Sequence, residues 1–86
     1  MASYSLLIKA SAAKELEATP KKDRIRLAAR IASLAFTPRP PGTEKLSGEE
    51  KYRIRQGDYR ILYLVEDAKL TVTVVKVGHR REVYRT

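Results

Sequence analysis

The sequence predicts a small α+β domain, in which an N-terminal strand and a pair of helices precede a mostly antiparallel sheet. Apolar and polar residues alternate over positions 4–9 and again over 51–77, where turn signals separate the runs. Between positions 12 and 35, apolar residues instead recur at the three-and-four spacing of a helix face. At 86 residues, the chain is expected to form a single domain spanning 1–86.

The first element is expected to be a strand from Tyr4 to Lys9. Alternation places Tyr4, Leu6 and Ile8 on one face of this strand. Ser11 is a suitable N-cap for a short helix that runs to about Ala18. Ala12 and Leu16 are expected to face the core from this helix.

A second helix is expected to begin at Thr19-Pro20, with threonine as the N-cap and proline at the first helical position. It runs to about Ala35 and forms an antiparallel hairpin with the first helix. Its apolar stripe consists of Leu27, Ile31 and Leu34, and basic residues occupy much of the remaining surface. Prolines and a glycine then indicate a loop over 36–44, and Lys45-Leu46-Ser47-Gly48 indicates a further turn, with Leu46 as a core anchor.

A tight hairpin is expected around Gly57-Asp58 in the run K-Y-R-I-R-Q-G-D-Y-R-I-L-Y. The pairs expected across it are Gln56–Tyr59, Arg55–Arg60, Ile54–Ile61 and Tyr52–Tyr63. Alternation sends the isoleucines and tyrosines to one face and Arg53, Arg55 and Arg60 to the other. Directly opposed like charges cost some tenths of a kcal/mol. We therefore expect an anionic partner for these arginines and interpret their face as a phosphate-binding surface.

A second hairpin is expected to turn at Glu66-Asp67-Ala68-Lys69. The pairs expected across it are Val65–Leu70, Tyr63–Val72 and Ile61–Val74, which extend the same core face. Val75 and Val77 would then share the opposite face with the arginines. The helices are expected to cover the core side, because the arginine side is mixed in polarity.

The charge balance favours a polyanionic partner. Eighteen Lys and Arg against ten Asp and Glu give a net charge of +8 and a pI of about 10.1, which points to nucleic acid, a ribosome-like surface or an acidic protein. The plain alternative is a solubilising surface charge.

The absence of cysteine excludes disulfides, thiolate zinc sites and cysteine nucleophiles. The one histidine and the lack of a convergent carboxylate pair predict no metal and no cofactor. No apolar run is long enough to span a membrane, so a cytoplasmic protein without a membrane partner is expected.

The order of elements and the motifs K-L-S-G, Y-R-I-R-Q-G-D-Y-R-I-L-Y and V-G-H-R-R-E-V-Y resemble the RelE/ParE superfamily of bacterial and archaeal toxins. The resemblance covers essentially the whole chain. It implies a small RelE-like fold: an N-terminal strand, a helical hairpin and a curved, mostly antiparallel sheet of about four strands around a basic concavity. Members like RelE enter the ribosomal A site and cleave messenger RNA there without a metal, whereas members like ParE poison DNA gyrase.

The resemblance also implies roles for the basic residues of the hairpin. Arg53 and Arg55 match positions that hold the RNA backbone, and Arg60 matches the arginine that stabilises the scissile phosphate. Arginine suits this task because its charge is permanent and its donors form a rigid fork. Lys51 of the same strand as Arg53 is a further candidate for RNA binding. The alternative for each residue is a solvated strand face, whereas Tyr52 and Tyr63 are interpreted as core aromatics.

Further roles are implied at the C-terminal end. Arg80 matches an arginine assigned to transition-state charge or leaving-group protonation, and Arg81 is a second candidate for that position that would bind RNA. Tyr84 matches a tyrosine proposed as general base or base-stacking platform; its alternative is to cover the sheet edge. His79 replaces a lysine of some members, and its imidazole could donate or accept a proton; its alternative is an ordinary surface histidine.

The resemblance therefore implies the toxin of a type II toxin–antitoxin system: a ribosome-dependent, metal-independent endoribonuclease. In this interpretation the 2′-hydroxyl of messenger RNA attacks the scissile phosphate in the 30S A site and translation stops. The expected inhibitor is a RelB-like antitoxin with an acidic, amphipathic segment that wraps the toxin, and the free toxin is expected to be a monomer. The alternatives are a ParE-like gyrase inhibitor on the same fold and a catalytically silent nucleic-acid-binding domain.

Overall fold

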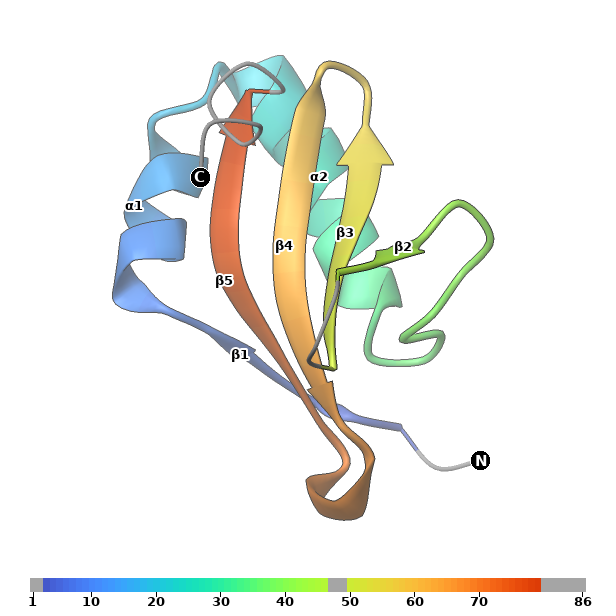
Figure 1. Cartoon of the computed structure of the whole chain (residues 1–86). Helices are drawn as coiled ribbons and strands as arrows, with labels where there is room; N and C mark the ends of the chain where they lie inside the picture. Colours follow the sequence, from blue (N-terminus) through green and yellow to red (C-terminus); the bar gives the residue numbers. More distant parts are fainter. Residues whose placement is uncertain (1–2, 47–49, 80–86) are drawn as a thin grey trace.

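A curved five-stranded sheet with helices on one side forms the body of the protein (Figure 1). The computed structural model describes residues 3–46 and 50–79. The elements are β1 (Ser5–Ile8), α1 (Ala10–Glu17), α2 (Lys21–Ser33), β2 (Glu44–Lys45), β3 (Lys51–Gln56), β4 (Tyr59–Glu66), the 3₁₀ turn η1 (Asp67–Lys69) and β5 (Thr71–His79). The strand order is β1-β5-β4-β3-β2, with β1 parallel to β5 and every other pair antiparallel. The predicted α+β fold is confirmed.

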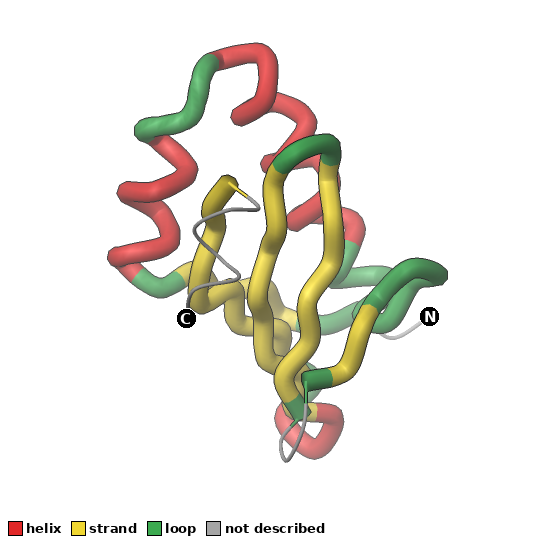
Figure 2. Tube along the Cα trace, turned by 45° about the horizontal axis from the view of Figure 1, so that its top comes forward, coloured by secondary structure: helices red, strands yellow, loops and turns green. Residues whose placement is uncertain are grey.

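The helices cover one face of the sheet. α2 lies behind β3 and β4, while α1 lies beside β5 (Figure 1). The two helices diverge from their short connection instead of packing along their whole length (Figure 2). The predicted apolar stripe of α2 and the predicted inward face of the sheet meet in one core. This core contains Ala12, Leu27, Ile31, Leu34, Tyr52, Ile54, Ile61, Tyr63, Val65, Val72, Val74 and Val77.

The helix ends differ by one or two residues from those expected. α1 begins at Ala10 after Lys9 and has no side-chain cap, so the predicted cap at Ser11 is wrong. α2 begins after Pro20, and the Thr19 hydroxyl instead donates to the carbonyl oxygen of Leu16 at 2.6 Å. Thr19 thus satisfies a carbonyl at the end of α1, which explains why it does not cap α2.

The first hairpin has the predicted register: Arg55 pairs with Arg60, Ile54 with Ile61 and Tyr52 with Tyr63. Gly57 takes a positive φ of 61°, whereas Asp58 does not have a positive φ. A positive φ at the first central residue is the pattern of a type II′ turn, whose twist matches the flanking strands.

The second hairpin has a different register from the predicted one. Val65 pairs with Val72 and Tyr63 with Val74, because η1 lengthens the turn and Leu70 closes it with a φ of 50°. A bulge at Leu62/Tyr63 then shifts the register again, so that Ile61 pairs with Val77. The prediction that Val77 lies outside the core is therefore wrong: it is 1% exposed.

A short strand also forms where a loop and turn were expected. β2 pairs Glu44 with Arg53 and Lys45 with Tyr52. Leu46 is half-buried, and its N–H donates to the carbonyl oxygen of Lys51 at 2.8 Å. Ser47 and Gly48 of the predicted turn lie outside the described residues.

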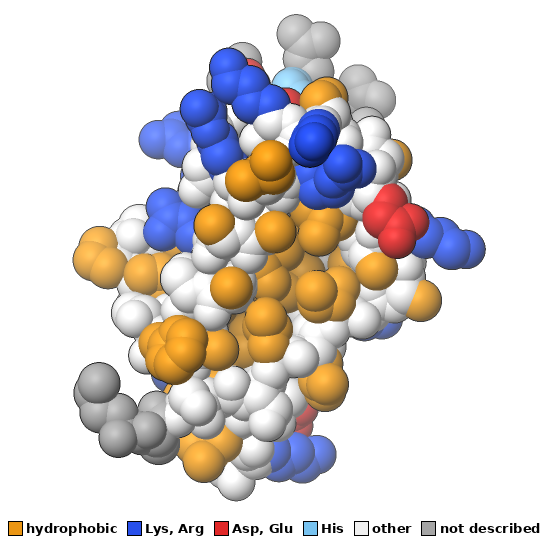
Figure 3. All heavy atoms as spheres, turned by 180° about the vertical axis from the view of Figure 1, so that it is seen from behind, with side chains coloured by type: hydrophobic (Ala, Val, Ile, Leu, Met, Phe, Trp, Pro, Cys, Tyr) orange, Lys and Arg blue, Asp and Glu red, His pale blue; other side chains and the backbone are white. Residues whose placement is uncertain are grey.

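The helix side of the molecule carries both charge and exposed apolar surface (Figure 3). The basic residues of α2 are Lys21, Lys22, Arg24, Arg26 and Arg30. The large apolar side chains exposed on and near the helices include Ile8, Ile25 and Phe36. None of the helices formed by the described residues is long and apolar enough to cross a membrane.

Candidate nucleic-acid interface

The predicted arginine face lies on the side of the sheet away from the helices. Ile54 and Ile61 point into the core, so the alternating residues of β3 and β4 point outward. This face carries Arg53 and Arg55 from β3 and Arg60 from β4. The hairpin therefore brings these three predicted site residues together with a fourth, Lys51, because its register sets which side chains share a face.

Arg60 is enclosed by its neighbours, with only 6% of its surface exposed. Its Nη1 donates to the carbonyl oxygen of Tyr59 at 3.2 Å. In the register it lies between Arg55 on β3 and Gly78 on β5, and the latter has no side chain to share that face. A largely buried guanidinium keeps its charge, since arginine does not deprotonate in proteins.

Besides Arg55, β3 carries two further cations, Arg53 and Lys51, whose surroundings differ. Arg53 forms an ion pair with Glu44 of β2 at 3.0 Å, and its side chain is 20% exposed. Lys51 is half-buried and pairs in register with Leu64. Same-face neighbours along a strand are about 6.6 Å apart. β3 therefore presents a row of cations, Lys51, Arg53 and Arg55, that leads toward the turn at Gly57.

His79 lies apart from the arginines. It is the register partner of Tyr59, and their rings meet edge-on with centroids 5.7 Å apart. Tyr59 packs against the core, so His79 lies on the helix side of the sheet and Arg60 on the other side. A cavity of about 240 Å³ adjoins His79, and Glu15, Thr19 and Tyr59 also line it.

Arg80, Arg81 and Tyr84 lie outside the described residues, so their proposed roles remain predictions. Within residues 3–46 and 50–79, no three acidic or histidine side chains gather as they would at a metal site.

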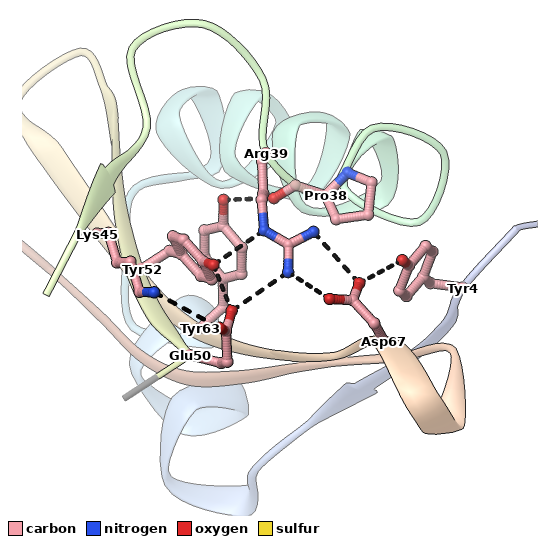
Figure 4. A network of polar contacts seen from close by, with 8 residues as sticks. All are labelled: Tyr4, Pro38, Arg39, Lys45, Glu50, Tyr52, Tyr63 and Asp67. Atoms are coloured by element: carbon pink, nitrogen blue, oxygen red, sulfur yellow. Dashed lines mark hydrogen bonds and ion pairs between the residues drawn. The ribbon is translucent and has the colours of Figure 1, made fainter. Parts of the chain in front are cut away.

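A polar network that the sequence analysis missed anchors the loop between α2 and β2 (Figure 4). The guanidinium of Arg39 donates to both carboxylate oxygens of Asp67, at 3.2 and 2.8 Å, and to Glu50 at 3.3 Å. Its Nε donates to the Tyr52 hydroxyl at 2.9 Å, and Tyr4 donates to Asp67 at 2.6 Å. The only local signal was a proline-rich loop, because every partner of Arg39 is distant in sequence.

This network shifts the pKa of both carboxyl groups. The hydrogen bonds from Arg39 and Tyr4 lower the pKa of Asp67 below its ordinary value of 3.8. The hydrogen bonds from Tyr52 and Arg39 lower the pKa of Glu50 below 4.5. Both shifts favour the ionised carboxylates, which keeps the loop attached to β3 and η1 near neutral pH.

Glu15 is a second residue that sequence reasoning missed. Its Oε1 accepts the backbone N–H of Val77 at 3.0 Å, and its Oε2 pairs with Lys76 Nζ at 3.0 Å. The helical pattern places Glu15 beside Leu16, yet nothing in the pattern indicates an interaction with strand residues 61 and 62 positions away.

The comparisons with known proteins agree with this geometry. A family model described as the ParE toxin of a type II toxin–antitoxin system matches residues 6–84. Toxin RelE of Mycobacterium tuberculosis is 28% identical over 95% of this chain and 87% of its own length. Toxin RelG of the same organism is 41% identical over 34 residues, which make up 40% of this chain but only 39% of RelG.

Solved structures show the same fold. The toxin chain of the intact E. coli RelBE toxin–antitoxin complex superposes with a TM-score of 0.79 at 26% identity, covering 90% of this chain and 96% of that one. The chain therefore belongs to the ParE toxin family of type II toxin–antitoxin systems and, within the wider RelE/ParE superfamily, to its RelE-like branch.

Proposed function

We propose that this toxin is a ribosome-dependent endoribonuclease that cleaves messenger RNA in the A site. The observation that carries the proposal is the placement of Arg60, 6% exposed, beside the exposed Arg55 on the open face of the sheet. An enclosed guanidinium next to an accessible one suits a backbone phosphate, since the first is held rigidly and the second can meet the strand from solvent.

In the proposed reaction, the 2′-oxygen bonds to the adjacent phosphorus and the bond to the 5′-oxygen breaks. The products are a 2′,3′-cyclic phosphate and a 5′-hydroxyl end. Arg60 neutralises the extra negative charge of the pentacoordinate phosphorus, while Lys51, Arg53 and Arg55 hold the neighbouring backbone. Arg80, or Arg81 in its place, and Tyr84 supply transition-state charge and proton transfer or base stacking. His79 is given no step in the proposed reaction, because it lies on the helix side of the sheet and Arg60 lies on the other side.

A programmed ribosome with purified toxin tests this proposal. Primer extension is expected to map cuts within the A-site codon, and the new 5′ ends should need a kinase before ligation because they carry hydroxyl groups. Arg60→Ala should lower the cleavage rate by about 10²–10³-fold, the usual effect of losing one preorganised contact to developing charge. Arg26→Ala on α2, an exposed residue away from this face, is the matched control and should cleave normally.

Inhibition of DNA gyrase is the second candidate, and the matching family model, which is that of the ParE toxin, favours it. A supercoiling assay with the same protein preparation separates the two. Loss of supercoiling together with intact ribosome-bound messenger RNA would overturn the nuclease proposal.

We further propose a RelB-like antitoxin with an acidic, amphipathic segment. The support is the net charge of +8 and the occurrence of the related E. coli toxin in a complex with its antitoxin. Binding is expected to weaken with salt and to protect Arg55 from arginine-specific modification. An antitoxin complex in which Arg55 reacts as fast as in the free toxin would contradict this arrangement.

A further inference from the structure

The last strand extends beyond the strand that pairs with it. β1 pairs with β5 from Thr71 to Val74, and the N–H of Lys9 donates to the Val74 carbonyl oxygen at 2.9 Å. β5 itself continues to His79. Beyond Val74, this edge of β5 lies beside α1 rather than beside β1 (Figure 1). Backbone groups on such an edge need a partner other than a neighbouring strand.

Glu15 supplies that partner from α1. Its carboxylate accepts the Val77 N–H and also pairs with Lys76, each at 3.0 Å. The side chains of Glu15 and Lys76 are 32% and 26% exposed. A hydrogen bond from a backbone N–H to a carboxylate is stronger than one to a neutral acceptor. Glu15 therefore connects the first helix to the last strand at two adjacent residues, Lys76 and Val77.

The hydrogen bond between Glu15 and Val77 lies between the β4–β5 bulge and the position that pairs with Arg60. The bulge at Leu62/Tyr63 lies just before it in the β4–β5 ladder, and a bulge interrupts regular pairing. The residue after Val77 is Gly78, the register partner of Arg60. His79 ends the strand, and Arg80 follows it in the sequence. The position of Val77 thus sets how β5 approaches Arg60.

We propose that Glu15 is a positioning residue for the nuclease site: by holding the Val77 N–H, it fixes the end of β5 against Arg60. This inference rests on the proposed nuclease function. The bond to the backbone N–H carries the effect, and the ion pair with Lys76 only orients the carboxylate. Glu15 does not touch the RNA and is not a catalytic residue.

Three substitutions separate these contributions. Glu15→Ala removes both interactions, Glu15→Gln keeps an amide oxygen that can accept the Val77 N–H, and Lys76→Met removes the ion pair but leaves the carboxylate. Glu17→Ala, on an exposed position of the same helix, is the matched control. Each protein is measured by single-turnover cleavage on programmed ribosomes over a range of toxin concentrations. Exchange of the Val77 amide hydrogen is followed by NMR in the free toxin.

Glu15→Ala is expected to lower the maximal cleavage rate roughly 10- to 100-fold, as small misplacements of reacting groups do, with little change in the half-saturating concentration. Its Val77 amide should exchange faster, while Glu15→Gln and Lys76→Met should stay within about threefold of the wild type in both measurements. The exchange measurement needs no nuclease activity, so it tests the connection even if the proposed function fails.

Three results would overturn the inference. The first is a Glu15→Ala protein whose Val77 amide is as protected as in the wild type, and the second is a Glu15→Ala protein whose maximal rate is unchanged. The third is a Glu15→Gln protein that loses as much cleavage as Glu15→Ala, because charge and not strand position would then be responsible. If Glu15→Ala does not fold, the comparison of Glu15→Gln with Lys76→Met decides the matter: a large loss of rate in either contradicts the proposal.

Discussion

Arg55 and Arg60 are directly opposed across the β3–β4 hairpin, two permanent cations at paired positions of an antiparallel ladder. Arg55 is exposed, whereas Arg60 is 6% exposed. Such a pair is unfavourable for folding, and its repulsion falls when a phosphate lies between the two guanidinium groups.

Replacing Arg55 is therefore expected to separate stability from binding. Arg55→Gln should raise the free energy of unfolding in urea by roughly 0.2–1 kcal/mol, because it removes a like-charge pair. The same change should reduce the salt dependence of RNA binding by about one ion. Arg26→Gln on α2 is the control and should change the stability by less than about 0.5 kcal/mol. A less stable Arg55→Gln protein would argue against repulsion at this pair.

The Arg39 network predicts acid sensitivity. The pKa values of Asp67 and Glu50 are lowered in the folded protein, so their contribution to stability is present above the ordinary values of 3.8 and 4.5. This contribution is lost as the pH falls through the lower folded-state pKa values, because the unfolded chain binds protons first.

Asp67→Asn should accordingly lower the urea midpoint at pH 7 and flatten the fall in stability below about pH 4. Unfolding curves from pH 2 to 7 provide the measurement, with Glu17→Gln as the control for simple loss of a negative charge. Equal acid dependence in Asp67→Asn and the wild type would show that Asp67 does not carry this effect.

Tyr63 joins the core to the loop that contains Arg39. Its hydroxyl donates to the Pro38 carbonyl oxygen at 2.7 Å, while its ring is fully buried (Figure 4). Tyr63→Phe keeps the ring but leaves that carbonyl without its donor, which should cost about 1 kcal/mol of stability. Urea unfolding with an unchanged m-value would assign the loss to this bond, and an unchanged midpoint would contradict it.

The bulge makes two valines of β5 a matched pair. Val77 is 1% exposed in the core, whereas Val75 is half-buried. Val77→Thr should destabilise the protein by about 1–3 kcal/mol, because it buries a hydroxyl in the apolar core. Val75→Thr should stay within about 0.5 kcal/mol of the wild type. A larger loss of stability in Val75→Thr than in Val77→Thr would mean that β4 and β5 pair without the bulge.

Much of this architecture follows from short-range patterns. The alternation on both sides of Gly57 was enough to predict the register that places Arg53, Arg55 and Arg60 on one face, because a two-residue turn leaves little freedom in pairing. The stripe of Leu27, Ile31 and Leu34 similarly identified the buried side of α2. Both patterns repeat within a few residues, so neither needs knowledge of distant partners.

The tertiary structure alone decided the rest. The longer turn at η1 and the bulge in β4–β5 moved Val77 into the core, since packing against the helices outweighed the simplest pairing. Arg39 and Glu15 find their partners, Asp67 and Val77, at separations of 28 and 62 residues. The sequence by itself determined the fold class, the family and the arginine face. Long-range contacts decide which loops and strand ends are held in place, and by which charges. These contacts form only when the sheet packs on the helices, so no local sequence pattern predicts them.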